Sequence, residues 1–137
     1  MPQTKTPEQS MKLDLQVREA ADRFAVALEQ CAESRSYREA VERVETDAEF
    51  SRLRRELGEA AGQYNAAHAD GTVTHEMISQ VQQLQQLVQF HEVNRDFRDA
   101  ESLLKERFAA CNELISEQIG FDFARIAAPH AGGCGTC

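Results

Sequence analysis

Two cysteines near the end of the chain are the residues whose type and spacing best suit chemistry. Cys134 and Cys137 form a C-x-x-C motif flanked by glycines, in a segment with no apolar core that would explain two thiols. This spacing lets both sulfurs face one metal ion, and glycine permits the tight turn around it. A redox role requires activation at a helix N-terminus, which we do not expect here. Metal ligation, redox chemistry and an inert tail all stay open.

A metal site built from this motif would need ligands from elsewhere. Zinc ions and iron–sulfur clusters usually take four protein ligands. The tail supplies Cys134 and Cys137, or three ligands with His130. We therefore expect any such metal or cluster to be shared with another chain. The remaining cysteines, Cys31 and Cys111, fall on apolar stripes of predicted helices, where cysteine commonly packs as a small hydrophobe.

Signatures of known enzymes are missing from the sequence. It contains no H-E-x-x-H, no G-x-S-x-G and no glycine-rich phosphate loop. Acidic residues stand three or four positions from arginine, as Glu39 does from Arg43, which is typical of ion pairs on a helix surface. Di-iron sites in helical bundles need Glu-x-x-His, whereas serine follows Glu76 and Glu113 at that spacing. We expect a protein without catalytic activity.

Composition narrows the class of protein further. The chain has 137 residues, of which 42% are hydrophobic and 28% charged, with a formal net charge of −8. Seven glycines and three prolines are too few for a β-sandwich or barrel. No apolar run suits a secretory signal or a membrane span, so we expect a cytoplasmic protein. The negative charge argues against direct binding of nucleic acid.

The chain has the periodicity of helices almost throughout, which predicts an all-α fold. Apolar residues recur at spacings of three and four, and Thr6, Ser36, Thr46 and Thr74 are candidate N-caps. Asp70-Gly71 is the strongest turn signal. A helical domain over 1–128, an elongated bundle or hairpin, precedes a flexible Gly- and Cys-rich tail over 129–137. The predicted helices span about residues 7–34, 37–45, 47–69, 74–90 and 93–127, with a further break near residues 90–94.

The last predicted helix carries a long, coiled-coil-like apolar stripe. Over residues 93–127 it would be roughly 50 Å long. Because its own hairpin partners cannot cover that length, we expect a second copy to bury part of the stripe, in a homodimer or a higher assembly. Phe121 lies off the stripe and is either an interface anchor or a single exposed aromatic residue. The predicted interface residues are Phe97, Leu104, Phe108, Ile115, Ile119 and Phe121.

The order of these elements resembles the YlbF/YmcA family, and YlbF-type members most. The first half of the resemblance is Glu33-Ser-Arg-Ser-Tyr37 followed by the stripe of Phe50, Leu53 and Leu57. The second half is Asp96-Phe-Arg-Asp-Ala-Glu101, the stripe of the last helix, Pro129 and a Gly-Gly-Cys-Gly tail. Together they cover about residues 11–137.

The resemblance implies a small, all-helical, cytoplasmic bacterial regulator that self-associates through its long helices. It implies partners similar to YmcA and YaaT, and joint action with ribonuclease Y in messenger RNA processing and in competence, sporulation and biofilm control. It also implies an iron–sulfur cluster held by subunit cysteines, here Cys134 and Cys137, although the family pattern has further cysteines after this point. The alternatives are a metal- or redox-active thiol protein and a plain helical oligomerisation module.

Overall fold

The computed structural model describes residues 7–128, with side chains from Asp14 onward. Every regular element in this range is an α-helix, which confirms the predicted all-α class. None of the described helices is long and apolar enough to cross a membrane. The helices are α1 (Pro7–Gln30), α2 (Ala32–Thr46), α3 (Ala48–Asp70), α4 (His75–Gln89), α5 (Glu92–Ile119) and α6 (Phe123–Ala127).

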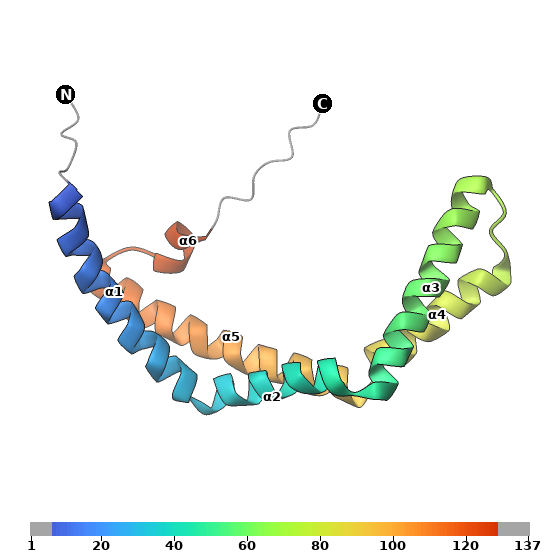
Figure 1. Cartoon of the computed structure of the whole chain (residues 1–137), viewed down its shortest axis with the longest axis horizontal. Helices are drawn as coiled ribbons and strands as arrows, with labels where there is room; N and C mark the ends of the chain where they lie inside the picture. The colour runs from blue at the N-terminus through green and yellow to red at the C-terminus, as the bar shows by residue number, and fades with distance from the viewer. Residues whose placement is uncertain (1–6, 129–137) are drawn as a thin grey trace, which may run out of the picture.

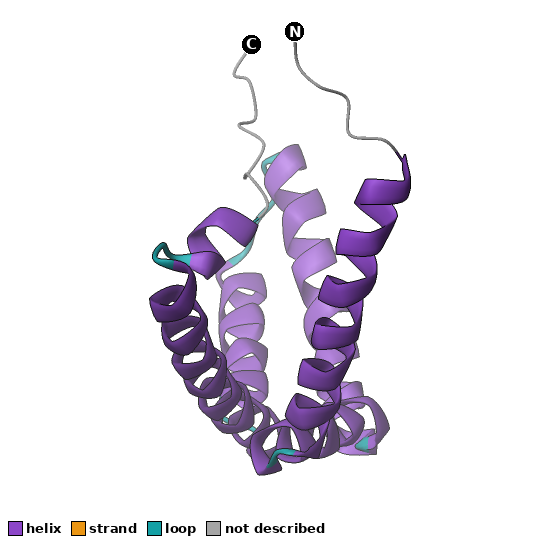
Figure 2. Cartoon of the chain, turned by 90° about the vertical axis from the view of Figure 1, so that its left-hand side faces the viewer, coloured by secondary structure: helices purple, strands orange, loops and turns teal. Residues whose placement is uncertain are grey.

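The helices follow a curved path built from antiparallel pairs (Figure 1). α2 packs along the first half of α5, and α3 and α4 form a hairpin beyond it. At the other end, α1 and the C-terminal half of α5 diverge, and the short α6 turns back over α5 (Figure 2). We call α1 together with residues 106–127 the fork. The chain thus has a paired middle, a hairpin at one end and an open fork at the other.

Small residues and a few large ones form the core. Leu53 and Ala60 of α3 are buried against Leu84 of α4. Where α2 crosses α5, alanines are buried on both helices, at Ala40 and Ala100. Alanine lets helix axes approach closely, so these contacts are tight but bury little apolar area per residue. The core therefore stabilises the middle and the hairpin, and it does not extend into the fork.

Two ion pairs, and the contact of the Tyr37 ring on α2 with the Phe97 ring on α5, fix the register of these helices. Arg43 pairs with Asp96 at 2.6 Å, and Arg107 pairs with Glu33 at the same distance. These pairs join residues 53 and 74 positions apart in the sequence, one near each end of α2. Because both pairs lie at the surface, they contribute little to stability, and their main effect is on register.

Several helix ends lie where the sequence places them. Thr74 caps α4 by accepting a hydrogen bond from the backbone N–H of Met77 at 3.2 Å. Gly71 follows α3 in the left-handed region, with φ of 71°, as the Asp70-Gly71 turn predicts. The break expected near residues 90–94 separates α4, which ends at Gln89, from α5.

Two predicted caps are wrong. The first helix ends at Gln30 rather than near residue 34, because Cys31 adopts an extended conformation and becomes the N-cap of α2, so Ser36 lies inside that helix. The next helix is capped by Asp47, whose carboxylate accepts from the N–H of Phe50 at 2.8 Å. Thr46 instead donates its hydroxyl to the carbonyl of Glu42 and belongs to the last turn of α2.

The predicted continuous helix over 93–127 is also wrong. It is divided into α5 and α6, because Gly120 adopts φ of 81°, a left-handed conformation that glycine enters without strain and that ends a helix. The apolar stripe continues across Gly120 in sequence, which is why periodicity alone missed the end. The 28 residues of α5 extend about 42 Å.

Candidate functional site

Exposed apolar side chains gather in the fork. Within the described residues, ten of the fourteen most exposed large apolar side chains lie there. Isolated exposed apolar residues are ordinary, but a concentration of them in one part of a small chain marks an interaction surface. The ten are Leu15, Val17, Phe24, Val26, Phe108, Leu114, Ile119, Phe121, Phe123 and Ile126.

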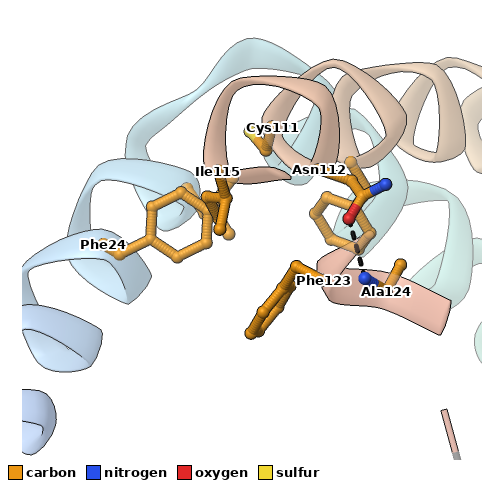
Figure 3. Close-up of a pocket in the computed structure, with 8 residues that line it drawn as sticks. Phe24, Cys111, Asn112, Ile115, Phe123 and Ala124 are labelled. Carbon is orange, nitrogen blue, oxygen red and sulfur yellow. Dashed lines mark hydrogen bonds between the residues drawn. The ribbon is translucent and has the colours of Figure 1, made fainter. Parts of the chain in front are cut away.

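Three helices of the fork line an apolar cleft of about 310 Å³. Phe24 reaches it from α1, Ile115 from α5 and Phe123 from α6 (Figure 3). The rings of Phe24 and Phe123 are each more than 40% exposed, so the cleft is open to solvent. We call it the fork cleft. Its lining residues are Phe24, Leu28, Phe108, Cys111, Asn112, Ile115, Phe123 and Ala124.

A polar joint holds α6 over the cleft. The first N–H groups of a helix have no partner inside it, and here α5 supplies two of the acceptors. Asn112 Oδ1 accepts from the N–H of Ala124 at 2.8 Å (Figure 3), and Ser116 Oγ accepts from the N–H of Phe123 at 2.9 Å. Asn112 Nδ2 also donates to Asp122 Oδ1 at 3.2 Å. The joint fixes the direction of a helix too short to be stable alone.

The carboxylate of Asp122 strengthens this joint. Its Oδ1 atom accepts from the N–H of Arg125 at 3.2 Å, as an N-cap of α6. This backbone hydrogen bond, followed by the one from Asn112, lowers the pKa of Asp122 below its ordinary value of 3.8. Asp122 is therefore ionised at neutral pH, where a negative charge at a helix N-terminus is favourable.

The structure divides the predicted interface residues into two groups. Phe108 and Ile115 line the fork cleft, and Ile119 and Phe121 are exposed at the end of α5. Phe97 and Leu104 lie nearer the middle and are half-buried. The ring of Phe97 stands 5.6 Å from that of Tyr37 on α2, so this side chain already has a partner inside the chain.

Two residues of the site were missed in the sequence. Asn112 and Ser116 lie off the apolar stripe, and polar residues in that position are usually solvated. Their spacing of four places them on one face of α5, one turn before Gly120. Two short polar side chains in the turns just before a glycine that ends the helix are the signal. They could have indicated that the following segment folds back over α5.

The predicted metal ligands Cys134, Cys137 and His130 lie outside the described residues. Over residues 7–128, no group of three or more His, Cys, Asp or Glu side chains is arranged to hold a metal ion. Cys31 and Cys111 are half-buried thiols, and Cys31 Sγ is 3.2 Å from the hydroxyl of Ser34.

Comparison with known protein families gives one match. The family described as "Control of competence regulator ComK, YlbF/YmcA" matches residues 17–120, which include most of α1 and all of α2 to α5. No curated protein and no solved structure was found to match. The description concerns control of a regulator, which agrees with a regulatory role. Its match over most of the chain, together with the all-helical fold, places this protein in the YlbF/YmcA family.

Proposed function

We propose that this protein is a non-enzymatic regulatory adaptor that acts by binding other proteins, with the fork as its contact to a second copy. The observation that carries the proposal is the fork cleft, which exposes Phe24, Phe108 and Phe123 on three different helices. Membership of a family tied to control of the competence regulator ComK supports the regulatory role.

The free energy of burying apolar side chains favours a symmetric contact between two copies. Full burial of a phenylalanine side chain is worth about 1.5–3 kcal/mol. A two-fold contact covers the same three rings in each copy. Because each of these side chains is already about half-buried, the six rings together contribute about 4–8 kcal/mol, at the lower end of the cost of association, about 4–15 kcal/mol. The other exposed side chains of the fork add to this. A dimer closed through the fork is the simplest arrangement that buries them all.

For the specific partners, we propose that the adaptor binds YmcA- and YaaT-like subunits and acts with ribonuclease Y in the processing of messenger RNA. Family membership supports this assignment. In this arrangement the ribonuclease contacts the RNA, since a chain with a net charge of −8 is poorly suited to binding phosphates.

Reconstitution tests the adaptor role. The protein is mixed with ribonuclease Y and the YmcA- and YaaT-like subunits of the same organism, and complexes are separated by size. We expect a stable complex and a changed cleavage pattern on a structured messenger RNA. Phe108→Ser should weaken the complex, whereas Ile78→Ser, an equally apolar exposed residue on α4, should not. Equal behaviour of the two variants would reject the fork as the functional surface.

We also propose that Cys134 and Cys137 supply two ligands to an iron–sulfur cluster shared with another chain. The donor set supports this, because two thiolates satisfy half of the usual four positions. A zinc site that adds His130 is the alternative. The test is to measure iron, labile sulfide, zinc and the visible spectrum after anaerobic purification, with the double variant Cys134→Ser/Cys137→Ser as control. Equal metal content in both proteins would reject a ligand role.

A further inference from the structure

A second apolar surface lies at the elbow between α4 and α5, at the base of the α3–α4 hairpin (Figure 1). It is a groove of about 610 Å³. Leu53 lies buried among its lining residues, and Leu87 and Phe90 are exposed. Phe90 is 74% exposed, the highest value among the large apolar side chains of residues 14–128. We call this the elbow groove.

Hydrogen bonds fix the elbow and therefore the position of Phe90. Asn94 Nδ2 donates to the carbonyl oxygens of Val88 and Gln89, at 3.1 and 3.3 Å. His91 caps α5 by accepting from the N–H of Val93 at 3.3 Å, and its ring stands 5.0 Å from that of Phe50. These hydrogen bonds hold the turn that carries Phe90 in one conformation. A preformed site of this kind loses little conformational entropy on binding.

The rim of the elbow groove is acidic. Glu49 and Glu92 line it, and the side chain of Glu49 is 70% exposed. Glu49 Oε2 is 4.0 Å from His91 Nε2. The residues that line the groove include no lysine or arginine. An exposed aromatic ring beside two carboxylates is complementary to an apolar side chain flanked by positive charges.

We propose that the elbow groove binds a basic, apolar segment of a partner protein, in which an aliphatic or aromatic side chain lies between lysines or arginines. The apolar side chain packs on Phe90 and Leu87, and the cations face Glu49 and Glu92. This inference goes beyond the proposed function, because the elbow groove and the fork lie at opposite ends of α5. One copy can then bind a second copy at the fork and a different protein at the elbow groove.

The test is a titration of the ¹⁵N-labelled full chain, observed by NMR, with a short amphipathic peptide of leucine and lysine. Two matched peptides are titrated alongside, one with every lysine replaced by glutamate and one with every leucine replaced by serine. We expect only the leucine–lysine peptide to bind, with shifts centred on residues 87–92. Phe90→Ser should weaken this binding about tenfold. Glu49→Gln/Glu92→Gln should weaken it severalfold and reduce its dependence on salt.

The controls separate this proposal from the fork. Phe121→Ser, which removes an exposed aromatic side chain from the fork, should leave the affinity for the peptide unchanged. Because Phe90 and both glutamates lie at the surface, circular dichroism of the variants should match that of the unmodified chain. Shifts centred on the fork, or equal binding of the glutamate peptide, would overturn the proposal. So would concentration-dependent self-association abolished by Phe90→Ser, which would show that a second copy occupies the groove.

Discussion

Asn112 is the residue on which the corner between α5 and α6 depends. Its side chain accepts from the N–H of Ala124 and donates to Asp122, so no apolar substitute satisfies both groups. We predict that Asn112→Ala weakens the joint by about 1 kcal/mol, as expected for a lost hydrogen bond. Amide exchange in residues 123–127 should then be roughly fivefold faster, while the α3–α4 hairpin is unaffected. Hydrogen–deuterium exchange measures this.

The matched control is Gln118→Ala, which removes an exposed amide from the same helix. It should leave exchange in residues 123–127 unchanged. If Asn112→Ala behaves in the same way as this control, the joint does not hold α6 in solution.

Glu33 gives the stability of the chain a dependence on pH. The hydrogen bond and charge of Arg107 lower the pKa of Glu33 below its ordinary value of 4.5. A carboxyl with a lowered pKa in the folded state stabilises the protein above its unfolded pKa. That contribution is lost as the pH falls through the folded value.

We predict that Glu33→Gln is less stable than the unmodified chain above about pH 4.5, and that the difference shrinks as the pH falls below that value. Urea unfolding between about pH 3 and pH 7 measures the free energy of unfolding of both proteins. Glu113→Gln, which removes an exposed carboxylate from α5, is the comparison. A difference for Glu33→Gln that stays constant with pH would exclude the ion pair as its source.

At the scale of elements, two glycines should respond in opposite directions to the same substitution. Gly120 has φ of 81°, where an alanine is strained, whereas Gly58 lies inside α3 with nothing within 4 Å of an added Cβ. We predict that Gly120→Ala destabilises the protein by about 1–2 kcal/mol. Gly58→Ala should stabilise it by about 0.5–1 kcal/mol. Denaturant unfolding at one fixed protein concentration compares them, and a stabilising Gly120→Ala would contradict a left-handed cap.

The same elements show how far sequence patterns reach. Thr74 and Gly71 were predictable because a short polar cap or a left-handed turn has a local cause. The cap at Thr46 was wrong because Asp47 stands next to it, and local propensity does not choose between the two residues. The cap at Ser36 was wrong because α2 begins after Cys31, which makes no side-chain cap hydrogen bond and so leaves no signal in the sequence. Gly120 was missed because the apolar stripe runs across it.

The site was predictable only in its apolar part. Phe108 and Ile115 could be placed on one stripe from their spacing, and the structure puts both in the fork cleft. The partners of Asn112 and Ser116 come from α6, which turns back only because the helix ends at Gly120. The exposure of Phe90 likewise depends on the elbow, whose hydrogen bonds join residues of two different helices.

At the scale of the whole molecule, the chain has a core in its middle and its hairpin, and two separate surfaces with exposed apolar side chains. α2 packs along the first half of α5, and the α3–α4 hairpin extends beyond the N-terminal end of α5 (Figure 1). The fork lies at the C-terminal end of α5, and the elbow groove lies at its N-terminal end. This separation is what an adaptor requires, because a contact at one surface leaves the other accessible.

The central claim, that the fork joins two copies, is tested most directly by light scattering after size exclusion at micromolar concentration. The chain has a mass of 15.4 kDa, and we predict a species of twice that mass. The double variant Phe24→Ser/Phe123→Ser should return the mass to 15.4 kDa, whereas Phe90→Ser at the elbow should keep it doubled. An unmodified chain that elutes as a 15.4 kDa monomer, or a dimer that the fork variant leaves intact, would contradict the account.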